Sequence, residues 1–294
     1  MRTTNKQAQV GLIGLAPMGR ALALNLRDKG YVVAVYNRTE SRTREFEKEC
    51  EKEFEEVDNK GRDDVKDNKG KDNKDKDNDT KDKSINDKST RDNDASGNDE
   101  SSTRLCDDDT STSNTNSTPT KGTFIYTYTI NAFINALQQP RKILTIIKSD
   151  ATDDLLAQLI PLLSKNDYIL DFSNSTPDIT EIRTRDTPCH YLGIGISGGT
   201  EGARNNGGLM VGGPSAAYAA VQPILFSISN SVGYFGDGGS GHFVKMVHNA
   251  VEYALMGVIA EFWEVLDRLG KHELMASWNE DMRMYLVEAA GTGV

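Results

Sequence analysis

The sequence predicts an α/β protein in which a doubly wound parallel sheet is followed by a long helical segment. Strand-like, helical and strand-like runs alternate within the first 36 residues. A glycine-rich turn joins the first strand to the first helix, and strands and helices continue to alternate up to residue 240. Alternation of this kind favours a parallel sheet with helices on both faces, so we predict a Rossmann-type domain.

The individual elements follow from hydrophobic period and turn residues. The first helix ends at Gly30, a residue suited to the left-handed position after a helix. The run YVVAVY is β-branched and reads as a buried strand. We predict strands over 9–15, 31–36, 142–147, 168–172, 190–196, 209–211 and 231–235, and helices over 18–29, 40–56, 132–138, 153–163, 214–226 and 241–269.

Residues 57–121 differ in composition from the rest of the chain. They are almost entirely Asp, Lys, Asn, Ser, Thr and Gly, in runs such as KDNKGKDNKDKDND. Such a segment buries too little apolar surface to offset its conformational entropy, so we predict a disordered low-complexity insertion. The predicted domains are therefore residues 1–56 plus 122–240, forming the sheet domain, and residues 241–294, forming a helical fragment.

Composition restricts the class of protein. The net charge is −10 and the mean hydropathy is −0.54, which favours a soluble protein. The sequence has no run of 18 apolar residues, so we expect no membrane-spanning helix. An excess of acidic residues argues against binding of nucleic acid. The N-terminus enters a strand without room for a signal peptide. Three cysteines and four histidines lack metal-binding spacing, so we expect free thiols, a cytoplasmic location and no metal.

The turn after the first strand carries a dinucleotide signature. Gly14 allows a tight turn, Ala16 is small enough for close approach of a pyrophosphate, and Gly19 permits close packing of helix on strand. The following helix, which begins near Met18, presents free N–H groups to the phosphates. We therefore predict a dinucleotide site here.

The residues after the second strand indicate which dinucleotide binds. An acidic residue there would hold the ribose 2′-hydroxyl of NAD, but this sequence has Asn37, Arg38 and Thr39. A guanidinium suits a 2′-phosphate, and Thr39 adds a hydroxyl and an N–H group. The pattern favours NADP.

A second glycine-rich loop follows the predicted strand at 190–196. Ser197, Gly198 and Gly199 stand where the carboxyl end of that strand is expected. Backbone N–H groups and a hydroxyl in such a loop can bind a carboxylate or a small polyol. We predict that this loop contacts the substrate.

The long helix carries four polar residues on one stripe. Lys245, His248, Asn249 and Glu252 stand at i, i+3, i+4 and i+7, which share a helix face. A desolvated lysine can act as a general base, and a glutamate two turns away can donate a proton. Each residue alone is more commonly structural, whereas the four together indicate an acid–base site.

Three motifs together resemble the 6-phosphogluconate dehydrogenase family. They are GLAPMG with NRT, ISGGTEGAR followed by LMVGG, and GHFVKMVHNAVEY. The resemblance covers residues 10–56 and roughly 142–269. Weaker similarity lies in IIKSDATDD, which resembles the family's cofactor loop, and in DFSNSTPDITEIRTRD. The resemblance implies that residue 241 begins an all-helical domain.

The resemblance also implies an activity and its residues. NADP would oxidise 6-phosphogluconate at C3, and loss of carbon dioxide would give ribulose 5-phosphate. Lys245 would take the proton of the C3 hydroxyl, and Glu252 would protonate C1 of the enediol. Further cofactor contacts would be Ile147, Lys148, Ser149 and Asn174. Substrate contacts would be Asn174, Ser197, Gly198, Gly199, His248, Asn249, Tyr253 and Thr292.

The sequence also departs from this family. The chain ends just inside the helical domain, which predicts a truncated member with an incomplete phosphate pocket and makes the family's homodimer doubtful. Near that end Thr292 is kept, but Ala290 replaces a phosphate-binding lysine. Thr200 replaces an acidic residue, and Ser149-Asp150 replaces alanine-glycine. Two alternatives stay open: a related β-hydroxyacid dehydrogenase for a smaller acid, and an inactive NADP-binding or interaction protein.

Overall fold

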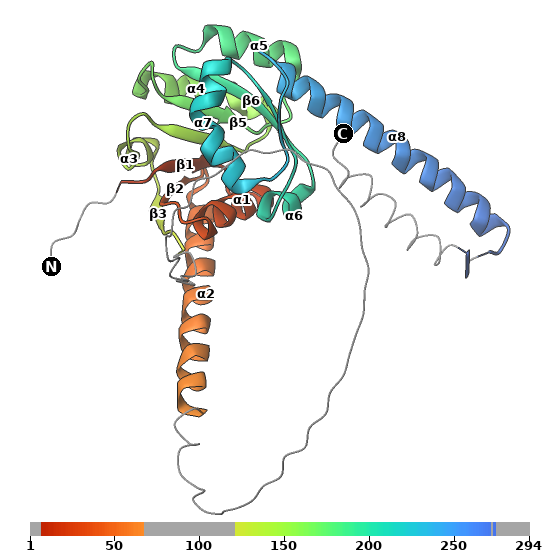
Figure 1. Cartoon of the computed structure of the whole chain (residues 1–294), viewed down its shortest axis with the longest axis horizontal. Helices are drawn as coiled ribbons and strands as arrows, with labels where there is room; N and C mark the ends of the chain where they lie inside the picture. Colours follow the sequence, from red (N-terminus) through yellow and green to blue (C-terminus); the bar gives the residue numbers. More distant parts are fainter. Residues whose placement is uncertain (1–6, 68–120, 272, 275–294) are drawn as a thin grey trace, which may run out of the picture. The chain divides into compact units, whose positions relative to one another are not determined.

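The computed structural model describes residues 7–67, 121–271 and 273–274. They form a sheet with helices on both faces (Figure 1). The strands are β1 (Val10–Ile13), β2 (Val33–Tyr36), β3 (Phe124–Thr127), β4 (Lys142–Thr145), β5 (Tyr168–Asp171), β6 (His190–Ile196), β7 (Leu209–Gly212) and β8 (Val232–Tyr234). The helices are α1 (Pro17–Asp28), α2 (Glu40–Asp67), α3 (Ile130–Asn135), α4 (Thr152–Leu159), α5 (Pro177–Asp186), α6 (Gly199–Arg204), α7 (Ser215–Ile228) and α8 (Ser240–Arg268), with short 3-10 turns η2 (Ser149–Ala151) and η3 (Ile160–Leu162).

The strand order confirms the predicted doubly wound sheet. The order is β3-β2-β1-β4-β5-β6-β7-β8, and all neighbours are parallel except β6 and β7. Strands β2 and β3 lie on one side of β1, and β4 lies on its other side, so the direction in which strands are added reverses between β1 and β4. Ligands of such sheets bind outside the carboxyl ends of the strands near this reversal.

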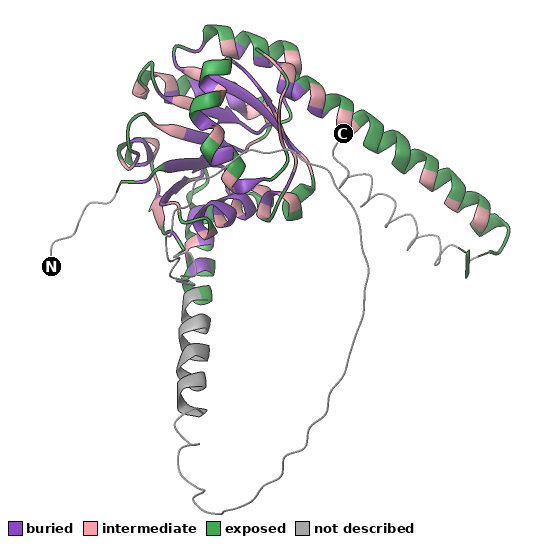
Figure 2. Ribbon diagram, in the orientation of Figure 1, coloured by how far each residue is buried: buried purple, intermediate pink, exposed green. Residues whose placement is uncertain are grey.

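Both faces of the sheet are buried (Figure 2). Along β2, Val33 and Val35 belong to one apolar cluster and Ala34 belongs to the other, as the period of a strand requires. The first cluster includes α1 and α7, and the second includes α3 and α4. Burial on both faces explains why the strands are continuously apolar rather than alternating.

The predicted strand at residues 190–196 is confirmed as β6, whereas the predictions differ from the structure at four other elements. Strand β3 was missed, as was helix α5, and residues of the predicted glycine-rich loop form helix α6. Helix α2 continues to Asp67, past the predicted end at residue 56, although residues 57–67 (VDNKGRDDVKD) include Asp, Asn and Gly, which are poor helix formers. The remaining predicted insertion, 68–120, lies outside the described residues.

Helix α8 contacts the sheet only through its first two turns. Gly193 and Gly195 of β6 make room for it: a Cβ at Gly193 would lie 3.0 Å from Nδ1 of His242, and one at Gly195 would lie 2.8 Å from Cγ of Lys245. The buried residues of α8 are Gly241, His242 and Lys245. The rest of α8 is therefore intermediate or exposed as far as Arg268.

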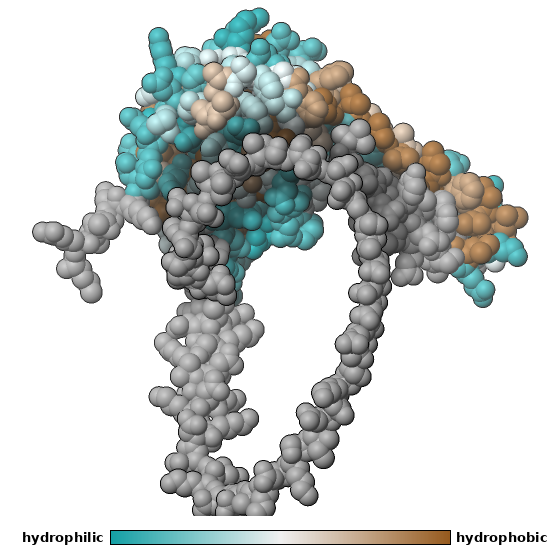
Figure 3. Space-filling view, in the orientation of Figure 1, coloured by the Kyte–Doolittle hydropathy of each residue, from teal (hydrophilic) through white to brown (hydrophobic). Residues whose placement is uncertain are grey.

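From Phe243 onward, α8 exposes apolar side chains, which gather along the helix in the space-filling view (Figure 3). These include Phe243, Met246, Val247, Val251, Met256 and Phe262. Within the described parts of the chain, the helices lack any apolar stretch of the length that a bilayer crossing requires.

Candidate functional site

A cavity of about 360 Å³ opens at the carboxyl ends of β1, β2 and β4. Seven of the predicted cofactor residues line it: Gly14, Ala16, Asn37, Arg38, Thr39, Ile147 and Lys148. The other lining residues were not predicted: Ile13, Tyr36, Arg42, Ile146, Ala151, Asp154, Leu155 and Gln158. The cavity thus joins the turn after β1, the loop after β2 and the segment from β4 into α4.

The turn after β1 needs its glycines for reasons visible in the backbone. Gly14 has φ of +105°, and its N–H group donates to the carbonyl of Tyr36 at 3.0 Å. A Cβ at Gly14 would overlap the carbonyl oxygen of Ile146, and one at Gly19 would overlap the carbonyl of Gly14. Gly19 therefore brings α1 against the turn without lining the cavity. Met18 packs partly against the apolar core instead.

Asn37 holds the shape of the cavity more than it offers free polar atoms. The Leu15 N–H group donates to its Oδ1 at 3.0 Å, and its Nδ2 donates to the Thr39 carbonyl at 3.0 Å. Both bonds are internal to the two loops that flank the cavity. The amide therefore ties the turn after β1 to the loop after β2.

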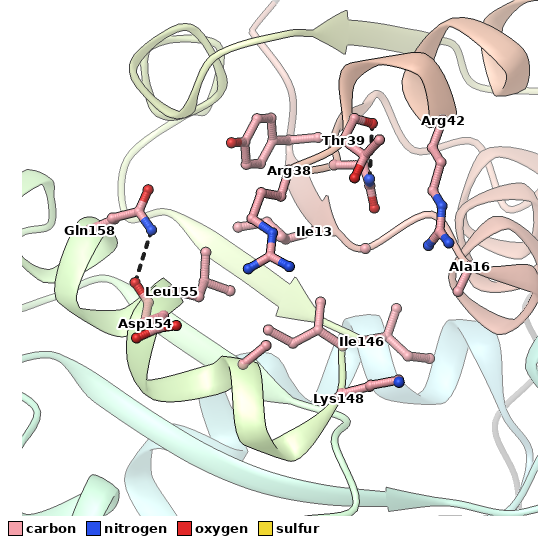
Figure 4. A pocket seen from close by; sticks show the side chains of 15 residues that line it. Ile13, Ala16, Arg38, Thr39, Arg42, Ile146, Lys148, Asp154, Leu155 and Gln158 are labelled. Atoms are coloured by element: carbon pink, nitrogen blue, oxygen red, sulfur yellow. Dashed lines mark hydrogen bonds between the residues drawn. The ribbon is translucent and has the colours of Figure 1, made fainter.

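Three basic residues and one acidic residue, Asp154, line the cavity. Figure 4 shows the guanidinium groups of Arg38 and Arg42 on the side of α2 and Lys148 on the wall formed after β4. Arg38 and Arg42 are both solvent-exposed, so they are available to an anion. Arg42 escaped prediction: it lies in the first turn of α2, whereas Arg38 lies in the loop before that helix.

The loops after β4 and β5 are joined beside the cavity. Ser149 lies outside the cavity lining, and its Oγ is 2.8 Å from Oγ of Ser175. Asn174 is exposed, whereas its neighbours Ser173 and Ser175 are buried. The loop after β5 therefore turns Asn174 outward and keeps the two serines inside.

The predicted substrate loop follows β6 at the same edge of the sheet. The Ser197 N–H group donates to the Gly208 carbonyl at 2.9 Å. Gly198 has φ of +86° and Gly199 has φ of +59°, backbone conformations that residues with a side chain rarely adopt. Gly198 is also the N-cap of α6, so this loop ends in a helix N-terminus.

Lys245 lies against β6, one strand from the loop of Asn174. Its side chain is 8% exposed, and its stem packs on Gly195 next to the sulfur of Met210. Burial lowers the pKa of Lys245, while the nearby Glu252 opposes this shift. A lysine that gives up its proton more easily is suited to general-base chemistry.

Three side chains of the polar stripe on α8 lie close together. Nζ of Lys245 lies 3.5 Å from Nδ1 of His248, and Oε2 of Glu252 lies 3.7 Å from the same nitrogen. His248 therefore stands between the two predicted catalytic groups. Asn249 is partly exposed and Tyr253 is 71% exposed. Thr292 and Ala290 lie outside the described residues.

The site thus has two parts that share one edge of the sheet. The cavity after β1, β2 and β4 collects the cofactor candidates, and the ends of β5 and β6 with α8 collect Asn174, Ser197 and Lys245. None of the predicted substrate residues lines the cavity itself. Across 7–67, 121–271 and 273–274, no group of three His, Cys, Asp or Glu is placed to hold a metal ion.

Comparison with known proteins identifies the family. A model of the NAD-binding domain of 6-phosphogluconate dehydrogenase matches residues 9–62 and 100–236, passing over the middle of the predicted insertion. The model of the C-terminal domain of 6-phosphogluconate dehydrogenase matches residues 241–292. The first model alone covers more than half of the chain.

Individual relatives agree with this result. The NADP(+)-dependent, decarboxylating 6-phosphogluconate dehydrogenase of Bacillus subtilis is 32% identical over 95% of this chain and 49% of its own length. The enzyme of Ceratitis capitata is 32% identical over 96% of this chain and 48% of its own. The chain therefore spans about half the length of the curated relatives it matches.

Solved structures extend the comparison to the fold. Plasmodium falciparum 6-phosphogluconate dehydrogenase, solved with NADP+ and with 6-phosphogluconate, is 29% identical, with a TM-score of 0.60 over 88% of this chain and 43% of that one. Mycobacterium tuberculosis 3-hydroxyisobutyrate dehydrogenase is 13% identical, with a TM-score of 0.56 over 90% of this chain and 67% of that one, and shares the fold. From its domain matches and the architecture of its sheet, this chain belongs to the 6-phosphogluconate dehydrogenase family.

Proposed function

We propose that this chain carries the NADP site and the acid–base residues for oxidative decarboxylation of 6-phosphogluconate to ribulose 5-phosphate. The observation that carries the proposal is the buried Lys245, held at the end of β6 with its Nζ 3.5 Å from His248. Lys245 lies at the same edge of the sheet as the cavity lined by Arg38 and Arg42. The relatives named above are enzymes of this reaction.

The cavity fits NADP on three grounds. Gly14 and Gly19 leave no room for side chains at the turn, so the backbone of the turn stays open to a pyrophosphate. The first turn of α1 offers free N–H groups. Arg38 and Arg42 would hold the 2′-phosphate through charge-assisted hydrogen bonds, and the wall includes no acidic residue from the end of β2 that would select NAD.

The residues of this chain then have distinct tasks. When bound, NADP supplies the hydride acceptor for oxidation at C3. Lys245 takes the proton of the C3 hydroxyl, because burial lowers its pKa, and afterwards protonates the keto oxygen to assist loss of carbon dioxide. Glu252, whose Oε2 lies 3.7 Å from Nδ1 of His248, would protonate C1. Ser197, Gly198, Gly199 and Asn174 would orient the sugar acid.

The direct experiment adds 6-phosphogluconate to the purified chain with NADP and follows NADPH fluorescence and release of carbon dioxide together. We expect both products in equal amounts and neither from the Lys245→Met variant. Tight binding of NADP without turnover at millimolar substrate would leave only an NADP-binding protein. NADPH formation without carbon dioxide would instead indicate a β-hydroxyacid dehydrogenase that does not decarboxylate.

We place this reaction in the cytoplasm. Cys50 and Cys189 are buried and form no disulfide, as expected for a reducing compartment. Burial raises the pKa of the Cys189 thiol to about 11, so this thiol stays protonated and unreactive at neutral pH.

A further inference from the structure

A buried arginine on α5 connects the loops that flank the two parts of the site. Arg183 is 5% exposed, and none of the sequence motifs assigned it a role. Its Nε donates to Oδ1 of Asp153 at 2.7 Å, in the first turn of α4. Its NH1 donates to Oγ of Ser175 at 2.6 Å, and its NH2 donates to the carbonyl of Ser149 at 3.3 Å.

These three contacts lie directly behind the wall of the cofactor cavity. Ser149 stands between Lys148 and Ala151, which both line the cavity, and Asp153 precedes the lining residue Asp154. The Ser149 carbonyl can rotate away only if it gives up the guanidinium. One side chain therefore contacts the segment from β4 into α4 at two points, Ser149 and Asp153.

The same guanidinium also fixes the loop after β5. Ser175 is held by Arg183 and lies 2.7 Å from Oγ of Ser173, whose hydroxyl donates to the buried Asp171 at 2.9 Å. Asn174 stands between these two serines and is the only exposed residue of the three. Anchoring both neighbours determines where the Asn174 amide points.

Asp171 extends the network to the catalytic helix. Nε2 of His242 donates to the Asp171 carbonyl at 3.1 Å, and Nδ1 of His242 lies 2.7 Å from the Thr180 hydroxyl. His242 precedes Lys245 by one turn of α8. The network therefore ends at the base of the helix that carries the proposed catalytic lysine.

We infer that Arg183 is a positioning residue: by joining the β4–α4 segment to the loop of Asn174, it holds the cofactor cavity in the shape that binds NADP. This inference rests on the proposed NADP site. The guanidinium spreads five N–H donors over three nitrogens in a rigid planar fork, whereas a lysine ammonium carries its three donors on a single nitrogen at the end of a flexible stem. A cavity wall that must be ordered by the ligand binds it less tightly.

The test replaces Arg183 with lysine and measures the Kd of NADP by titration calorimetry. The matched control is Arg141→Lys. Arg141 is also a largely buried arginine, with NH1 2.9 Å from Oδ2 of Asp167 and Nε donating to the Ile134 carbonyl, but it precedes β4 at the opposite edge of the sheet. Both variants lose a buried arginine, and only one of them touches the cavity wall.

We expect Arg183→Lys to weaken NADP binding by about tenfold, which corresponds to about 1.4 kcal/mol, and Arg141→Lys to change it less than about twofold. Amide hydrogen exchange should accelerate in residues 146–154 and 172–176 only for Arg183→Lys. Should Arg183→Lys fail to fold, Ser175→Ala removes one acceptor at smaller structural cost and should show the same exchange pattern.

Three outcomes would overturn the inference. An unchanged Kd for Arg183→Lys means that the wall keeps its shape without the guanidinium. An equal loss in both variants means that general destabilisation, rather than the wall, weakens binding. Absence of NADP binding to the unmodified chain removes the proposed cofactor site as well, and so is distinguishable from the first two.

Discussion

Removal of Arg38 should weaken NADP binding and leave NAD binding nearly unchanged. Arg38 and Arg42 both line the cavity beside the end of β2 and are solvent-exposed. A hydrogen bond to a charged group contributes about 1.5–3 kcal/mol, and exposure favours the lower end of this range. Arg38→Ala should therefore raise the Kd of NADP by about tenfold, and the double variant with Arg42→Ala by about a hundredfold.

The assay compares NADP and NAD titrations at fixed ionic strength, because exposed charge interactions are screened by salt. Arg44→Ala is the matched control. Arg44 belongs to the same helix, but its Nε donates to Glu40 at 2.8 Å and its guanidinium lies 4.5 Å from the Tyr128 ring centroid, outside the cavity lining. Equal loss of NAD and NADP affinity in Arg38→Ala, or an equal effect of Arg44→Ala, would refute a 2′-phosphate site.

Three further changes test the turn, the lysine and the histidine. Gly14→Ala should destabilise the fold by more than about 1–2 kcal/mol, since φ is +105° and the new Cβ meets the Ile146 carbonyl, whereas Gly257→Ala in open space on α8 should stabilise by about 0.5–1 kcal/mol; urea unfolding separates them. Lys245→Met should abolish turnover yet raise Tm, because burial disfavours the charged lysine below its unfolded pKa; a lower Tm contradicts this. Burial lowers the pKa of His242, so below about pH 6.5 the unfolded chain takes up a proton that the folded chain does not. The free energy of unfolding should therefore decrease as the pH falls, by at most about 1.4 kcal/mol per pH unit. His242→Gln should flatten the Tm profile between pH 7.5 and 5.5, and an unchanged slope would contradict the assignment.

Prediction succeeded where a local pattern carries its own physical reason. The turn at Gly14 was predictable because a positive φ and a missing Cβ are local requirements. The stripe on α8 was predictable because helix spacing alone puts Lys245, His248 and Glu252 side by side.

Prediction failed at both ends of the polar segment, at helix α2 before it and at strand β3 after it. Strand β3 was missed although its residues FIYT all favour a strand, because it directly follows a long polar segment; in the structure it pairs with β2. Helix α2 passes the predicted boundary through residues 57–67, where Asp, Asn and Gly give no local signal for a helix.

The sequence by itself predicted the alternation of strands and helices except for β3, α5 and α6. It also predicted the glycine turn after β1, Arg38 as a cofactor residue and the polar stripe on α8, since each depends on neighbours within a few residues. The tertiary structure alone decided that Arg42 faces the cavity, that Asn37 is occupied in joining two loops, and that Lys245 is buried against a glycine of β6. It also placed Arg183 behind the cavity wall, 34 residues along the chain from the Ser149 carbonyl that it binds. Contacts of that range exist only after the strands have paired, because the sheet brings the loops at their carboxyl ends together.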